Sequence, residues 1–273
     1  MESFQDQGIV LSIRPHGENG AIVNLMTQGQ GRACGYVRGA RSSKMRGTLE
    51  PGNIVDANWQ SRVADGLGTY TLELSKSHAA SFMQDPLRLG ALQSACALVD
   101  AALPEREAHA GLYHGLCALF DVLEQDIWGA AYVMWEIAFL KELGFSLDLS
   151  KCAGGGDDNA LAYVSPKTGR AVSYEAGAPY RDKLLALPGF LKPRRSNTEG
   201  VVRHLLESEQ TSSLLRGSSE AGDVYTGLQM TGYFLEHWVF NHHTKGVPDP
   251  RLLFEERFAK TVVHTEMSEN VSG

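Results

Sequence analysis

In the first 75 or so residues, apolar and polar side chains alternate with a period of two. This part of the chain contains no helical stretch long enough to connect two parallel strands. The clearest run is 69–75, in which Tyr70, Leu72 and Leu74 share one side. Short alternating runs bounded by turn-forming residues are typical of β-strands. Five such runs are present, at 8–14, 21–27, 31–38, 53–59 and 69–75. They predict a small five-stranded barrel of the OB type, with an SH3-like barrel as the alternative.

The periodicity changes after Lys76. Apolar residues then recur at spacings of three and four, which is the pattern of a buried helix face. These stripes lie at 89–103, 112–123, 128–143, 201–206 and 224–239. One interruption, at 152–174, holds a glycine-rich acidic loop followed by two short apolar runs around a Pro/Gly turn, which predicts a β-hairpin.

The sequence therefore indicates an α+β protein. We expect an N-terminal OB-fold domain at 1–80 and a mainly α-helical domain at 81–260. The second domain would contain an inserted β-hairpin element at 150–180, and a flexible tail would follow at 261–273. At roughly 150 residues per domain, a chain of 273 residues fits this division.

Composition excludes several classes of protein. Hydrophobic residues make up 43% of the chain and charged residues 21%, as in ordinary globular proteins. No apolar run approaches the ~20 residues of a membrane helix, and the first residues lack the basic and apolar regions of a secretory signal. The four cysteines are scattered without a CxxC pair, which is typical of free thiols in a reducing compartment. We expect a cytoplasmic protein that does not contact a membrane.

Charge is distributed unevenly along the chain. The net charge is −7, but residues 1–80 carry eight basic and seven acidic residues, while 81–273 carry seventeen and twenty-five. Five basic residues and no acidic one lie within 32–46; they are Arg32, Arg38, Arg41, Lys44 and Arg46. Because salt screens charges beyond about 10 Å, a local cluster matters more to a polyanion than the total. With Tyr36 as a base-stacking platform, the segment predicts contact with DNA; a merely solvated loop is the alternative.

Compact catalytic signatures are missing from the sequence. It has no phosphate-binding loop, no GxSxG nucleophile elbow and no HExxH zinc motif. We therefore expect a binding protein with no catalytic residues and no cofactor. Two rivals stay open. Asp157 and Asp158 could hold Mg²⁺ in a metal-dependent nuclease or nucleotidyltransferase, or the chain could be a protein adaptor that does not bind DNA.

Several stretches, taken in order, resemble one family. They are Gly17 to Thr27, the VRGARSSK run at Val37 to Lys44, and the LEPG run at 49–52. The helical part adds WEIAFLKELGF from Trp135 and LAYVSPKTGRAV from Leu161. Together they are similar to RecO, a bacterial family of DNA repair and recombination mediators.

The resemblance implies the OB domain, the helical domain and a zinc-ribbon-like insertion. It implies binding of single- and double-stranded DNA and annealing of complementary strands near the nucleoid. It also implies that the chain acts with RecR to load RecA onto strands covered by single-stranded DNA-binding protein (SSB).

Two expectations about sites follow. The acidic and aromatic C-terminal tail of SSB would dock on the helical domain near Trp135, Phe139 and Lys141, unless these residues belong to the core and to a solvated face. Some family members carry four zinc cysteines around the hairpin. Here only Cys152 remains, so we expect a degenerate element without metal.

Overall fold

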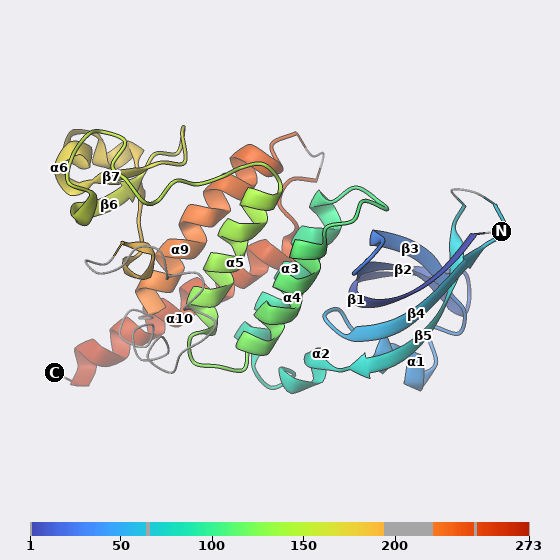
Figure 1. Ribbon diagram of the computed structural model, residues 1–273. Helices are drawn as coiled ribbons and strands as arrows, with labels where there is room; N and C mark the ends of the chain where they lie inside the picture. Colours follow the sequence, from blue (N-terminus) through green and yellow to red (C-terminus); the bar gives the residue numbers. More distant parts are fainter. Residues whose placement is uncertain (1, 64–65, 194–220, 243–244, 273) are drawn as a thin grey trace. The chain divides into compact units, whose positions relative to one another are not determined.

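The computed structural model describes residues 2–63, 66–193, 221–242 and 245–272 (Figure 1). The chain packs as two compact units. The first contains Met1–Asp121 and Val247–Phe254, and the second contains Val122–Gly246 and Glu255–Gly273. A five-stranded barrel followed by a mainly helical region with a small sheet confirms the predicted α+β class. The helix predicted at 201–206 lies outside the described residues.

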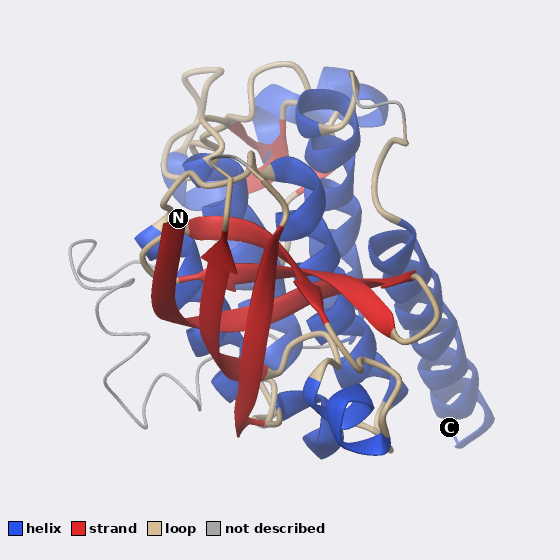
Figure 2. Ribbon diagram, turned by 90° about the vertical axis from the view of Figure 1, so that its right-hand side faces the viewer, coloured by secondary structure: helices blue, strands red, loops and turns tan. Residues whose placement is uncertain are grey.

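The barrel contains all five predicted strands (Figure 2). They are β1 (Glu2–His16), β2 (Gly20–Thr27), β3 (Gly31–Val37), β4 (Ile54–Ser61) and β5 (Gly68–Lys76). The order around the barrel is β1-β2-β3-β5-β4. β1 starts earlier than its apolar pattern indicates, because Glu2–Gln7 pair with β4; Gly8 and Ile9 pair with both β4 and β2, and the rest of the strand pairs with β2.

The barrel closes through a short parallel contact in which Gly35–Val37 of β3 pair with Gly68–Tyr70 of β5. Both strands carry a glycine there because aromatic rings fill the adjacent space. A Cβ atom on Gly68 would lie 2.0 Å from the ring of Trp59, and one on Gly35 would lie 2.4 Å from Tyr70. The Trp59 indole is 1% exposed, and its N–H donates to the Cys34 carbonyl oxygen at 3.0 Å.

Asn53 joins the segment after β3 to the segment after β5. The first of these contains α1 (Ser43–Thr48) and the second contains α2 (His78–Ser81). The fully buried Asn53 donates from Nδ2 to the carbonyl oxygens of Gly47, at 2.7 Å, and Thr48, at 3.4 Å. Its Oδ1 accepts from the Ser77 hydroxyl at 3.3 Å and from the Ala79 N–H at 3.2 Å. One side chain therefore fixes the end of α1 and the start of α2.

The first unit extends beyond the predicted boundary at residue 80. It includes α3 (Pro86–Ala102), which the Asp85 side chain caps, and α4 (Ala110–Val122) up to Asp121. The loop between these helices binds the edge of β3, since the Arg106 N–H donates to the Arg32 carbonyl oxygen at 2.7 Å. The boundary at 80 separates strands from helices along the sequence, but the first two long helices pack with the barrel.

The second unit consists of helices and the small sheet. Its helices among the described residues are α5 (Trp128–Glu142), α6 (Tyr174–Gly177), α9 (Ala221–Phe234) with the π-helical turn η4 (Leu235–Val239), and most of α10 (Asp249–Ser272). Its short 3-10 turns are η1 (Asp158–Ala160), η2 (Ala178–Lys183) and η3 (Gly189–Leu191). A buried hydrogen bond from the Thr231 hydroxyl to the Glu136 carboxylate joins α9 to α5. α10 continues to Ser272, where the sequence analysis expects a flexible tail.

The predicted hairpin consists of β6 (Leu161–Val164) and β7 (Ala171–Ser173). Its turn closes where the Gly169 N–H donates to the Ser165 carbonyl oxygen at 2.8 Å. A third strand, β8 (Leu185–Ala186), which the sequence analysis does not predict, extends the sheet in the order β7-β6-β8. Among the described helices, none has the length and apolar character needed to span a bilayer.

We expect Asn53→Ala to lower the free energy of unfolding by about 3 kcal/mol, because it leaves several buried backbone groups without partners. Urea denaturation followed by circular dichroism measures this change. Asn58→Ala on β4 is the matched control, since Asn58 is only partly buried, and it should stay within about 0.5 kcal/mol of the parent. A loss at Asn53 no larger than the loss at Asn58 would contradict its role as the link between α1 and α2.

Candidate nucleic-acid interface

Four of the five clustered cations form an exposed group between β3 and β4. Arg38 follows β3, Arg41 lies in the next turn, and Lys44 and Arg46 lie on α1; we call these four residues the basic segment. All four side chains are exposed. Within the described part of the chain none of them forms an ion pair with a carboxylate. Their charge is therefore available to an external anion.

The sequence of α1 determines which way these cations point. Met45, Thr48 and Leu49 recur at spacings of three and four, and all three face inward: Met45 packs against the barrel core, and Thr48 and Leu49 are buried. Lys44 and Arg46, the two neighbours of Met45, lie to either side of this inward face and are exposed to solvent. At the start of α1, the Ser42 hydroxyl accepts the Met45 N–H at 3.3 Å and caps the helix.

Arg32, which the sequence analysis groups with these cations, has a different role. Its side chain is only 18% exposed. Nε donates to the Leu103 carbonyl oxygen at 2.9 Å, and the guanidinium lies 3.4 Å from the Asp100 carboxylate. The loop that follows α3 covers this part of β3. Arg32 therefore connects β3 to α3, and a DNA contact at this position stays a prediction.

Tyr36 lies on the outer face of β3. Its ring covers Gly20, where a Cβ atom would lie 2.1 Å from the phenol oxygen, and it meets His16 edge-to-face at 6.1 Å. Tyr36 pairs with Ile22 on β2, which pairs in turn with Arg14 on β1. Residues directly opposite one another share a face of a sheet. We call Arg14, Ile22 and Tyr36 the Tyr36 row.

The exposed Arg14 belongs to this candidate interface, although the sequence analysis does not select it. Its position could have been found by extending the alternation of β1 past Ile13 and aligning β1 with β2. The row lies at the end of β3 from which the basic segment begins, because Arg38 follows Tyr36 by two residues. This end of the barrel thus carries both the Tyr36 row and the four cations of the basic segment.

Trp59 cannot serve as a second stacking platform. Phe4 stacks on its ring, with the centroids 5.2 Å apart and the planes 14° apart, and the guanidinium of Arg106 lies 4.4 Å from its centroid. The ring belongs to the barrel core and is not available to a nucleic-acid base.

Two family models match successive parts of this chain. The family model for the N-terminal part of recombination protein O matches residues 1–78, and the one for its C-terminal part matches 83–199. A protein named DNA repair protein RecO from Rhodospirillum centenum is 48% identical over 259 residues, which cover 94% of this chain and 95% of that protein. Its namesake from Caulobacter vibrioides is 45% identical over 258 residues, covering 94% and 98%. The chain belongs to the RecO family.

The zinc cysteines known from some RecO proteins have no counterpart around Cys152. Burial opposes ionisation of this thiol, but hydrogen bonds from Ser173 and from the N–H groups of Gly154 and Gly156 outweigh it and lower the pKa of Cys152. The loop also packs against Ala176, which lies 2.9 Å from a Cβ atom placed on Gly154. Neither Ser173 nor Ala176 offers a thiolate or an imidazole, so these residues do not fit a four-ligand zinc site.

The carboxylates next to this loop are engaged within it. Asp158 accepts the Cys152 N–H at 2.6 Å, and Asp157 accepts the N–H and the side-chain amide of Asn159, both at 2.9 Å. In the described residues no group of three or more His, Cys, Asp or Glu side chains is placed to hold a metal ion.

The residues expected to dock an SSB tail in a RecO protein lie on α5. Trp135 is 7% exposed and Phe139 is fully buried, and their rings stack with centroids 5.4 Å apart. Lys141 is exposed. In this structure the two aromatic rings are part of the helical core, whereas Lys141 faces solvent; docking of an SSB tail at these residues stays a prediction.

The different roles of Arg32 and Arg38 lead to a stability prediction. Arg32→Ala should lower the free energy of unfolding by about 2 kcal/mol, because it removes charge-assisted hydrogen bonds and leaves a partly buried carboxylate. Arg38→Ala, the matched control, should change it by less than about 0.5 kcal/mol. Parallel urea titrations measure both values. Equal free energies of unfolding for the two variants would show that the contacts of Arg32 stabilise the fold no more than those of the exposed Arg38.

Proposed function

We propose that this chain is a non-catalytic DNA-binding mediator of repair and recombination, which binds single- and double-stranded DNA through the basic segment and the Tyr36 row. The observation that carries the proposal is the exposure of Arg38, Arg41, Lys44 and Arg46, none of which forms an ion pair with a carboxylate of the described residues. The relatives named DNA repair protein RecO support the same role.

Strand annealing requires no catalytic group. Two complementary strands repel each other through their phosphates, and a protein that neutralises part of this charge lets them approach and pair. Each phosphate contact also releases counterions, so affinity for a single strand falls with added salt by about 0.7 logarithmic units per contact. Tyr36 adds a base-stacking surface of roughly 1–3 kcal/mol per base, which is insensitive to base sequence.

Within this proposal the remaining partners follow from the family. We propose that the chain acts with RecR on SSB-coated strands at the nucleoid in the cytoplasm, engages the acidic tail of SSB, and thereby promotes loading of RecA. The SSB site is proposed for the second unit, with the exposed Lys141 as the cation that meets the acidic tail.

The two rival functions are less well supported. A nuclease or nucleotidyltransferase at Asp157 and Asp158 would need these carboxylates for a metal, but they accept hydrogen bonds that shape their own loop. An adaptor that does not bind DNA leaves unexplained why four exposed cations gather in the basic segment, none of them in an ion pair with a described carboxylate.

Replacing all four residues of the basic segment with Ala tests the proposal. The log–log salt slope for binding a single-stranded oligonucleotide should become less steep by about 2.8, because four phosphate contacts are lost. Binding should weaken for all sequences alike. Fluorescence anisotropy over a range of salt concentrations measures the slope.

The matched control replaces four exposed cations of the second unit, Lys151, Lys167, Arg181 and Lys183, with Ala. This variant has the same net charge as the first and should keep the parental slope. If the salt slope falls equally in both variants, DNA binding depends only on the total charge of the protein. If neither does, the interface lies elsewhere, and in both cases the proposed site is wrong.

A further inference from the structure

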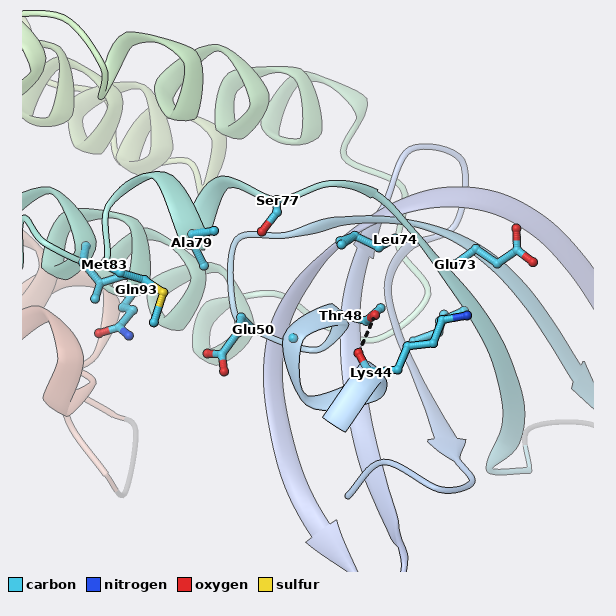
Figure 3. Close-up of a pocket in the computed structure, with 13 residues that line it drawn as sticks. Lys44, Thr48, Glu50, Glu73, Leu74, Ser77, Ala79, Met83 and Gln93 are labelled. Atoms are coloured by element: carbon cyan, nitrogen blue, oxygen red, sulfur yellow. Dashed lines mark hydrogen bonds between the residues drawn. The ribbon is translucent and has the colours of Figure 1, made fainter. Parts of the chain in front are cut away.

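A groove in the first unit lies between α1 and β5. Its volume is about 770 Å³. Figure 3 shows α1, with Lys44 and Thr48, on one side, and the chain from Leu74 through Ser77 and Ala79 to Met83 bounding the other side. Lys44 of the basic segment lines the groove, whereas no residue of the Tyr36 row does.

One edge of β5 is open where it borders this groove. β3 pairs with β5 only as far as Tyr70 and then turns away toward α1, whereas β4 follows β5 to Lys76. In the described part of the chain no strand pairs with the other edge of residues 72–76. Alternate residues of a strand direct their N–H and C=O groups toward each edge, so this edge offers main-chain hydrogen bonds to an added strand.

The groove floor is apolar and partly uncovered. The inward side of β5 contributes the buried Leu72 and then Leu74, which is 45% exposed. Met83 is 75% exposed at the other end. An extended peptide beside β5 would place every second side chain against this floor.

The outer face of the same strand is acidic. Glu73 on β5 pairs directly with Asp56 on β4, and both are exposed. Like charges at such a position repel each other. Among the described residues no cation forms an ion pair with either carboxylate. A lysine or arginine on an added strand, next to Glu73, would relieve this repulsion.

The walls of the groove are already fixed. Gly47, Thr48, Ser77 and Ala79 all line it, and the side chain of Asn53 binds all four of them. A ligand would therefore need to order only itself, which favours binding.

We propose that this groove binds an extended segment of a partner protein, in which apolar and basic residues alternate, as an additional strand on β5. The apolar side chains lie over Leu72 and Leu74, the basic side chain lies beside Glu73, and the main chain bonds to the free edge.

A fluorescein-labelled peptide of alternating valine and lysine tests the proposal by fluorescence anisotropy on the full chain. Glu73→Lys should weaken its binding at least tenfold and allow a valine–glutamate peptide to bind instead. This substitution should not unfold the barrel, since Lys would face Asp56. The control Glu124→Lys changes charge equally at an exposed position outside the groove and should leave both peptides unaffected.

Two further measurements test the geometry. Gly47→Phe should reduce binding at least tenfold without changing the charge, because Gly47 lines the groove and no atom lies within 4 Å of its Cβ position. A peptide N-methylated at every second residue should lose binding, and hydrogen exchange at 72–76 should slow only with the unmodified peptide.

Binding that survives N-methylation, or that is indifferent to both Glu73→Lys and Gly47→Phe, would overturn the proposal. So would light scattering that shows the chain forming a dimer that Gly47→Phe disrupts, because the occupant would then be a second copy.

Discussion

The buried amide of Asn53 determines how the first unit presents its surfaces. Six residues form too short a helix to be stable alone in water, yet α1 carries two of the four cations of the basic segment. Asn53 satisfies carbonyl groups at the end of α1 and an N–H group at the start of α2. The cations therefore project from a fixed element, and the entropy lost on binding a strand is smaller than for a flexible loop.

Closure of the barrel explains the distribution of the aromatic residues. Trp59 and Tyr70 occupy the space that Gly35 and Gly68 leave, so they support the contact between β3 and β5 and are unavailable to a ligand. Tyr36 lies on the opposite face of β3 and is only partly buried. Within the described residues, the same short contact leaves 72–76 of β5 without a paired strand on one edge, so the way the barrel closes produces both the outward Tyr36 row and the open strand edge.

The sequence predicts the strands, the hairpin and the basic segment well, because each depends on a local pattern. It predicts less well what depends on distant packing. Residues 2–7 of β1 are mostly polar and form a strand only because β4 pairs with them. Arg32 belongs by sequence to the basic cluster, but a loop some 70 positions later covers it. Trp135 and Phe139 belong to an apolar helical stripe whose spacing suits a core helix and a peptide-binding groove equally. Only the burial of the two side chains in the structure shows that they belong to the core.

The central claim is that DNA contacts the barrel end that carries the basic segment and the Tyr36 row. Hydrogen exchange of the full chain, with and without a single-stranded oligonucleotide at low salt, tests it most directly. The account predicts slower exchange in peptides that cover 14–22 and 36–48, and unchanged exchange in peptides that cover 161–187. Protection confined to the second unit, with 36–48 unaffected, would contradict it.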